Sequence, residues 1–126
     1  MLTKKQIIQE HDKLIELFGG TLGMHYDGKI ERTIERYNES KNKKEACIEF
    51  YYEIIVGHPF VDGNKRTATH FLEHLLELNG YRLNATNEQI VKMALDIARK
   101  NEEMEKKKRT PVSLDYVKDY TAKFII

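Results

Sequence analysis

Prolines and glycines, the residues that most readily interrupt helices, are confined to a few places in this chain of 126 residues. The only prolines are Pro59 and Pro111, and all seven glycines lie within residues 19–80. The remaining stretches carry apolar residues at helical spacing. We therefore expect an all-α fold, a compact helical bundle in one domain spanning residues 1–126, with at most a small hairpin at residues 20–29.

Capping signals indicate where several of the helices begin. Thr3 with Gln6, and Thr86 with Gln89, have the spacing of a capping box, in which each side chain accepts a hydrogen bond from the other residue's backbone N–H. Residues 45–56 have apolar groups around most of the helix, which is typical of a helix buried on several sides. The sequence predicts six helices, which follow Thr3, cover residues 29–38, 45–56 and 66–78, and follow Thr86 and Ser113.

Charge and cysteine content narrow the classes of protein to which the chain can belong. Charged residues make up 33%, but 21 Lys and Arg nearly cancel 20 Asp and Glu, so the formal charge is +1. A nearly neutral chain is poorly suited to coating nucleic acid or an anionic membrane. Cys47 is the only cysteine, and no apolar run reaches the roughly 18 residues of a membrane span. We expect a cytoplasmic protein without a nucleic-acid or membrane partner.

The most distinctive segment, His58-Pro-Phe-Val-Asp-Gly-Asn-Lys-Arg66, lies between the third and fourth predicted helices. If it opens the following helix, free backbone N–H groups around Gly63, Asn64 and Lys65 form an anion site at the positive end of the helix dipole. The Asn64 side chain can add N–H donors, Lys65 adds a positive charge, and Arg66 offers a planar fork that matches phosphate oxygens. The segment therefore predicts phosphate binding.

Two further side chains of this segment point to group transfer. Asp62 is a hard oxygen ligand suited to Mg²⁺ bound to a nucleotide. His58 has an ordinary pKa near neutrality, which suits it to take a proton from an attacking hydroxyl. Together with a phosphate site, these residues are the components of phosphoryl or nucleotidyl transfer.

The nine residues 58–66, hereafter the signature segment, resemble the signature of the Fic and Doc (Fido) superfamily, His-x-Phe-x-Asp/Glu-Gly/Ala-Asn-Gly/Lys-Arg, at every position. Three other stretches are similar to the Doc (death-on-curing) branch, namely His11-Asp-Lys-Leu-Ile-Glu16, Gly19-Gly20 and Asp27-Gly-Lys-Ile-Glu31. The resemblance implies a Fic/Doc helical bundle with the signature segment between two central helices.

The same resemblance assigns roles to the residues of the signature segment. It implies that His58 is the general base on a target hydroxyl, that Asp62 holds Mg²⁺, and that ATP is the substrate. It also implies that four residues bind the nucleotide phosphates, namely Gly63, Asn64, Lys65 and Arg66.

Two positions bear on which group is transferred. Doc toxins resemble this chain in having lysine at the position of Lys65, and they pass the terminal phosphate of ATP to a target threonine, whereas AMP-transferring Fic enzymes usually have glycine there. The resemblance thus implies a Doc-like kinase of a toxin–antitoxin pair, with elongation factor Tu as the suggested target. At Gly63, however, Doc has alanine and AMP-transferring members have glycine, which keeps protein adenylylation as the alternative.

The resemblance also suggests how the activity is restrained and where a target binds. We find no inhibitory Ser/Thr-x-x-x-Glu-Gly/Asn helix, because Thr69 and Glu73 have the spacing but lie in the helix of the signature itself. A separate antitoxin protein is therefore expected. Residues 20–29 correspond by position to a flap that docks the target, which makes Tyr26 and Asp27 candidates for target contact, with plain loop structure as the alternative.

Two other classes of function have to be weighed. His70-Phe-Leu-Glu73-His74 fits the His-x-x-Glu-His pattern of inverted zinc peptidases, but these side chains fall on the polar face of the predicted helix, where surface residues are the simpler interpretation. A catalytically inactive binding module is the remaining alternative. Against it, no visible part of the signature is lost, because it retains His58, Asp62, Asn64 and Arg66.

Overall fold

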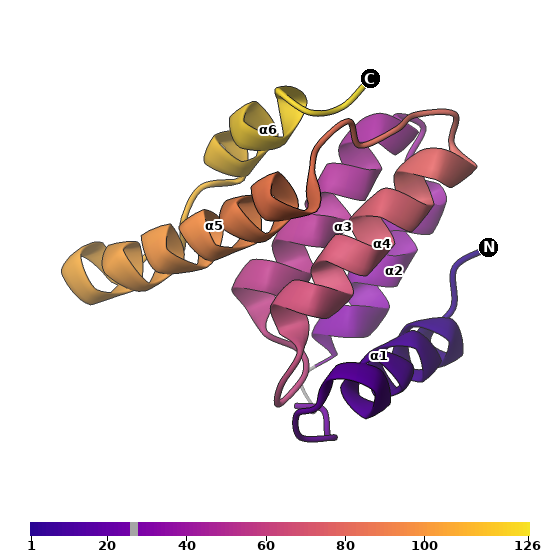
Figure 1. Ribbon diagram of the computed structural model, residues 1–126, viewed down its shortest axis with the longest axis horizontal. Coiled ribbons are helices and arrows are strands. Elements are labelled where there is room, and N and C mark those ends of the chain that lie inside the picture. The colour runs from indigo at the N-terminus through magenta and orange to yellow at the C-terminus, as the bar shows by residue number, and fades with distance from the viewer. Residues whose placement is uncertain (26–27) are drawn as a thin grey trace.

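The computed structural model describes residues 1–25 and 28–126, and within these ranges it contains six α-helices and no strand. The all-α prediction is confirmed. Figure 1 shows α3 and α4 crossing the middle of the molecule, with α1 on one side and α5 and α6 on the other. The helices are α1 (Lys4–Phe18), α2 (Lys29–Glu39), α3 (Lys43–Gly57), α4 (Asn64–Leu78), α5 (Asn87–Lys108) and α6 (Leu114–Ala122).

The predicted caps form at three helices. Thr3 and Gln6 make the capping box of α1, and Thr86 and Gln89 make that of α5. The Ser113 hydroxyl accepts a hydrogen bond from the Tyr116 N–H at the start of α6. A cap of this kind stabilises a helix by about 1 kcal/mol.

The helix α4 begins two residues earlier than its apolar periodicity indicates. Gly63 adopts the left-handed conformation, with φ at 77°, and serves as the N-cap without a side-chain hydrogen bond. A glycine takes this conformation without the clash that a Cβ atom would bring. The helix therefore starts at Asn64, and the last three residues of the signature segment form its first turn.

The core is built around α3, which packs against α2, α4, α5 and α6. This confirms that residues 45–56 lie in a helix buried on several sides. Cys47 lies within this core and forms no disulfide. Each large apolar side chain that is fully buried contributes about 1.5–3 kcal/mol. The buried residues of α3 are Ala46, Cys47, Ile48, Phe50, Tyr51, Ile54 and Ile55.

The segment that follows α1 docks on the signature segment. Met24 and Phe60 form a single antiparallel bridge, in which the His25 N–H donates to the Pro59 carbonyl at 2.8 Å and the Val61 N–H donates to the Gly23 carbonyl at 3.0 Å. Residues 20–25 therefore pair with the signature segment and form no hairpin with one another.

The longest helix, α5, has 22 residues, and its C-terminal end extends beyond the other helices (Figure 1). Its last turn carries Lys106, Lys107 and Lys108, whose positive charges are favourable at the negative end of the helix dipole. Among the helices described, none combines the length and the apolar character that crossing a membrane requires.

Candidate active site

The signature segment begins at an uncommon backbone conformation. α3 ends at Gly57, and His58 is its C-cap in the left-handed region, with φ at 48°. Residues other than glycine seldom adopt this conformation, and those that do cluster at functional sites. The turn directs the chain away from α3 and leaves the His58 side chain exposed.

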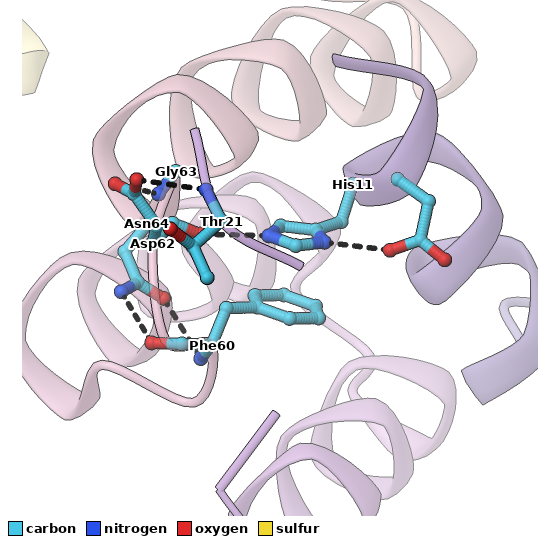
Figure 2. Close-up of polar contacts among 7 residues, drawn as sticks. His11, Thr21, Phe60, Asp62, Gly63 and Asn64 are labelled. Carbon is cyan, nitrogen blue, oxygen red and sulfur yellow. Dashed lines mark hydrogen bonds and ion pairs between the residues drawn. The ribbon is translucent and has the colours of Figure 1, made fainter. Parts of the chain in front are cut away.

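The side chain of Asn64 closes the segment into a fixed loop. Its Oδ1 atom accepts a hydrogen bond from the Phe60 N–H at 3.0 Å, and its Nδ2 atom donates to the Phe60 carbonyl at 2.8 Å (Figure 2). Asn64 is 8% exposed. Oδ1 and one of the two Nδ2 hydrogens are engaged with Phe60, and donation from this amide to a phosphate, which the sequence suggested, stays a prediction. The backbone N–H of Asn64 is a further donor for an anion.

The opposite side of the loop rests on His11 of α1. Its ring stacks on Phe60 with centroids 3.7 Å apart, and its Nε2 atom lies 2.7 Å from the Asp62 carbonyl oxygen (Figure 2). Sequence reasoning assigned His11 no role. One signal was available, because Ile7, His11 and Ile15 form the buried stripe of α1 and a histidine in such a stripe requires a hydrogen-bond partner.

The carboxylate of Asp62 is exposed and held by backbone N–H groups. Thr21 donates to Oδ2 at 3.1 Å, and Gly63 donates to Oδ1 at 2.8 Å. These two hydrogen bonds, followed by the charges of Arg66 and Lys65, hold the pKa of Asp62 below its usual value. Gly20 permits the close approach of the 20–25 segment, since a Cβ atom there would lie 2.9 Å from Oδ2 of Asp62.

Asp62 fits the magnesium ion that the sequence suggests. Mg²⁺ is commonly bound by one or two carboxylates together with substrate phosphates, and it keeps several waters. Asp62 is ionised, exposed and next to the first turn of α4, and each of its oxygens retains lone pairs beyond the single hydrogen bond that it accepts.

The first turn of α4 presents unused donors and positive charge. In the described part of the chain, the backbone N–H groups of Asn64, Lys65 and Arg66 have no hydrogen-bond partner. The Arg66 guanidinium lies over the Phe18 ring, 4.9 Å from its centroid, and makes one long hydrogen bond of 3.4 Å to the Gly19 carbonyl. Such a helix N-terminus is an anion-binding site.

The electrostatic surroundings of His58 favour its neutral form. Partial removal of the ring from water lowers its pKa from the ordinary 6.5, and the positive charges of Lys65 and Lys29 act in the same direction. Glu105 and Glu102 of α5 oppose the shift. A histidine with a lowered pKa is unprotonated at neutral pH and can accept a proton.

A cavity of about 450 Å³ lies against the first turn of α4. This volume is in the range of small-molecule sites. Its polar wall is formed by Asp62 and the first residues of α4, and its opposite wall is contributed by Val91, Ala94 and Leu95 of α5. The structure thus brings five of the predicted site residues to one cavity, namely Asp62, Gly63, Asn64, Lys65 and Arg66, while His58 lies outside its lining.

The zinc alternative finds no support in the structure. The His70 and His74 rings stack with centroids 6.2 Å apart, and His70 pairs with Glu10 of α1 at 3.2 Å. Within residues 1–25 and 28–126, no group of three or more His, Cys, Asp or Glu side chains is arranged to hold a metal ion.

The predicted target contacts Tyr26 and Asp27 lie outside the described residues.

A comparison with protein families matches residues 1–76 to the Fic/DOC family. The chain belongs to the Fic/DOC family. Among curated proteins, none matches the chain significantly. Fic/DOC proteins are generally transferases of ATP-derived groups onto proteins. The matched range contains α1, α2, α3, the signature segment and most of α4, so the apolar wall from α5 lies beyond the part of the chain that the Fic/DOC match covers.

Proposed function

We propose that this Fic/DOC protein is a Doc-like toxin that transfers the terminal phosphate of ATP to a threonine or serine hydroxyl of a target protein. The observation that supports phosphoryl transfer most is Lys65. This residue lies in the first turn of α4, exposed, without a polar partner in the described ranges, and beside the unused N–H groups. A flexible cation at this place can neutralise charge on the phosphates of ATP.

Substrate binding follows from the first turn of α4. The N–H groups of Asn64, Lys65 and Arg66 donate to phosphate oxygens, and the Arg66 guanidinium exchanges its long bond to Gly19 for a charge-assisted one. Asp62 is the residue that would hold Mg²⁺, which when bound neutralises phosphate charge and orients the phosphates. The apolar side chains of Val91 and Leu95 would face the uncharged part of the nucleotide.

His58 supplies the base for the transfer step. Its unprotonated ring nitrogen takes the proton from the target hydroxyl while the hydroxyl oxygen forms a bond to the γ-phosphorus. The bond between the γ-phosphorus and the bridging oxygen breaks, and its electron pair leaves with ADP. The products are a phosphorylated target, ADP and a proton on His58, which is released to solvent before the next cycle.

Gly63, the residue whose resemblance favours AMP transfer, has another explanation. Gly63 is in the left-handed conformation, and a Cβ atom there would lie 2.9 Å from Cδ1 of Ile15 and 3.5 Å from Nε2 of His11. Packing against α1 therefore accounts for the glycine irrespective of the chemistry. Gly63 consequently adds nothing to the case for adenylylation, and Lys65 is the better guide to the reaction.

The resemblance to the Doc branch supports the remaining parts of the proposal. We place the protein in the cytoplasm, with elongation factor Tu as the target and a separate antitoxin protein as the restraint. Both partners follow from that resemblance alone.

Position-specific labelling of ATP tests the proposed reaction. The purified protein and its His58→Ala variant are incubated with elongation factor Tu, Mg²⁺ and ATP radiolabelled at either the γ- or the α-phosphate. We expect the γ-label to appear on the target with the unchanged protein and not with His58→Ala. Transfer of the α-label would establish adenylylation instead, and equal labelling by His58→Ala would overturn the role of His58.

A further inference from the structure

His11 lies entirely inside the protein, next to the signature segment, and is 51 residues away in sequence from Asp62, which it contacts. Burial of an imidazole costs free energy unless its polar atoms are hydrogen-bonded. Nε2 of His11 has the Asp62 carbonyl oxygen as its partner, and Nδ1 lies 3.0 Å from Oδ1 of Asp12, a contact that is a hydrogen bond only when Nδ1 also carries a hydrogen. The site described above uses neither His11 nor Asp12 to bind substrate.

The hydrogen bond from His11 to Asp62 holds the peptide group between Asp62 and Gly63. A carbonyl oxygen only accepts, so Nε2 of His11 carries the hydrogen and donates it to the Asp62 oxygen. The N–H of the same peptide group belongs to Gly63, and it donates to the Asp62 carboxylate. The peptide between Asp62 and Gly63 is thus held at both of its polar ends, and its orientation is fixed.

The orientation of this peptide sets the geometry of the site on both sides. On one side it places the Asp62 carboxylate, and on the other it leads into Gly63, the N-cap of α4. The His11 ring also lies parallel to Phe60, with 6° between the ring planes, and Phe60 is the residue that the Asn64 side chain holds. His11 therefore contacts the loop at both Phe60 and Asp62 (Figure 2).

We propose that His11 is a positioning residue of the transfer site. Its Nε2–H holds the Asp62–Gly63 peptide in the orientation that presents the Asp62 carboxylate and the first-turn N–H groups of α4 to one Mg²⁺–ATP. The proposal rests on the proposed function, because it concerns the same nucleotide. Residues that hydrogen-bond to metal-binding groups orient those groups, and their loss weakens metal binding or activity about 10- to 100-fold.

Two variants that differ by one methylene group separate positioning from plain packing. His11→Gln carries an amide N–H that reaches about as far as Nε2, whereas the amide of His11→Asn is too short to reach Asp62. Both variants lose the stacked ring, so a purely structural role predicts the same effect for the two. A positioning role predicts that His11→Gln retains Mg²⁺–ATP binding and His11→Asn loses it.

The measurement is the affinity for Mg²⁺–ATP by isothermal titration calorimetry, with thermal unfolding recorded for each variant. We expect His11→Gln to bind within about threefold of the unchanged protein, and His11→Asn to bind at least about tenfold more weakly, which corresponds to about 1.4 kcal/mol. Equal affinities for His11→Asn and the unchanged protein would overturn the proposal.

A third variant keeps the proposal testable if His11→Asn fails to fold. His11→Phe preserves the ring stack on Phe60 and removes only the hydrogen bonds, and we expect the same loss of Mg²⁺–ATP affinity from it. An affinity of His11→Phe equal to that of the unchanged protein would overturn the positioning role alone. Absence of Mg²⁺–ATP binding by the unchanged protein would instead overturn the proposed function, and with it this inference.

Discussion

The signature segment has an inner and an outer set of residues, and the two sets differ in burial and in bonding. The inner residues Pro59, Phe60 and Asn64 are buried, and Phe60 and Asn64 are joined by a pair of hydrogen bonds. Among the outer residues, His58, Asp62 and Lys65 are exposed. The inner set determines the shape of the segment, and the outer set carries the groups that can react or bind.

This difference separates residues that look equivalent in the sequence. Asn64, Lys65 and Arg66 are consecutive polar residues, and the sequence predicted phosphate binding for all three. The structure gives the Asn64 side chain to the loop and leaves those of Lys65 and Arg66 on the surface. Substitutions of the inner set should lower the free energy of unfolding, whereas substitutions of the outer set should lower activity at unchanged stability.

The largest expected effect is the loss of phosphoryl-transfer activity in His58→Ala. Loss of a general base typically lowers the rate about 10²- to 10⁴-fold, so we expect phosphoryl transfer to fall about a thousandfold. Because the side chain is exposed, the melting temperature and the affinity for Mg²⁺–ATP should stay unchanged. The checks are a rate assay, thermal unfolding and calorimetry on the same preparation. A large fall in the melting temperature would place His58 in the inner set and break the comparison.

A loss of stability is expected for Asn64→Ala. The change leaves the N–H and the carbonyl of Phe60 without partners, and each unpaired buried group costs about 1–3 kcal/mol. We expect the free energy of unfolding in urea to fall by about 3 kcal/mol.

Asn87→Ala provides the matched control, because Asn87 is also the first residue of a helix but is exposed. It should leave the free energy of unfolding within about 0.5 kcal/mol of the original. Equal effects of the two substitutions would contradict the inner role of Asn64.

Arg66→Ala should weaken nucleotide binding without unfolding the protein. Hydrogen bonds to charged groups contribute about 1.5–3 kcal/mol, so we expect the affinity for Mg²⁺–ATP to fall about 10- to 100-fold. The difference should shrink at high salt, since exposed charges are screened. Calorimetry at two salt concentrations measures both effects, and Arg82→Ala, another exposed arginine, is the control. An unchanged affinity would exclude Arg66 from the phosphate site.

The smallest expected effect is a shift in the pH profile. His58 acts as a base only when unprotonated, and its pKa is lowered, so the acid limb of kcat/KM should lie below pH 6.5. Lys65→Ala removes one of the charges that lower this pKa, and the limb should move to higher pH. Lys5→Ala removes a lysine that is not among those charges and should leave the limb in place. A limb that moves to lower pH in Lys65→Ala would contradict this account of the pKa.

Local sequence signals were sufficient for the helices. The capping boxes at Thr3 and Thr86 and the apolar periodicity depend on residues within one or two turns, and the structure confirms them. The start of α4 was missed because it depends on the left-handed conformation of Gly63, which no apolar pattern reports.

The contacts that shape the site could not be predicted from periodicity. The bond from His11 to Asp62 joins residues 51 positions apart, and a buried stripe shows which face of α1 is covered but not what covers it. Likewise, Val91 and Leu95 lie beside the buried face of α5, and only the tertiary structure brings them opposite the first turn of α4. Sequence reasoning predicted which groups carry the chemistry, which stays a prediction, and the structure was needed to find the residues that pack against those groups.

Backbone amide NMR spectra recorded during a titration with Mg²⁺–ATP test the central claim most directly. The account places the phosphates at the start of α4, so the amide resonances of Gly63, Asn64, Lys65 and Arg66 should show the largest shifts, together with those of Val91 and Leu95 across the cavity. Shifts confined to another part of the molecule, such as the surface around His70 and His74, or no shifts at all, would contradict it.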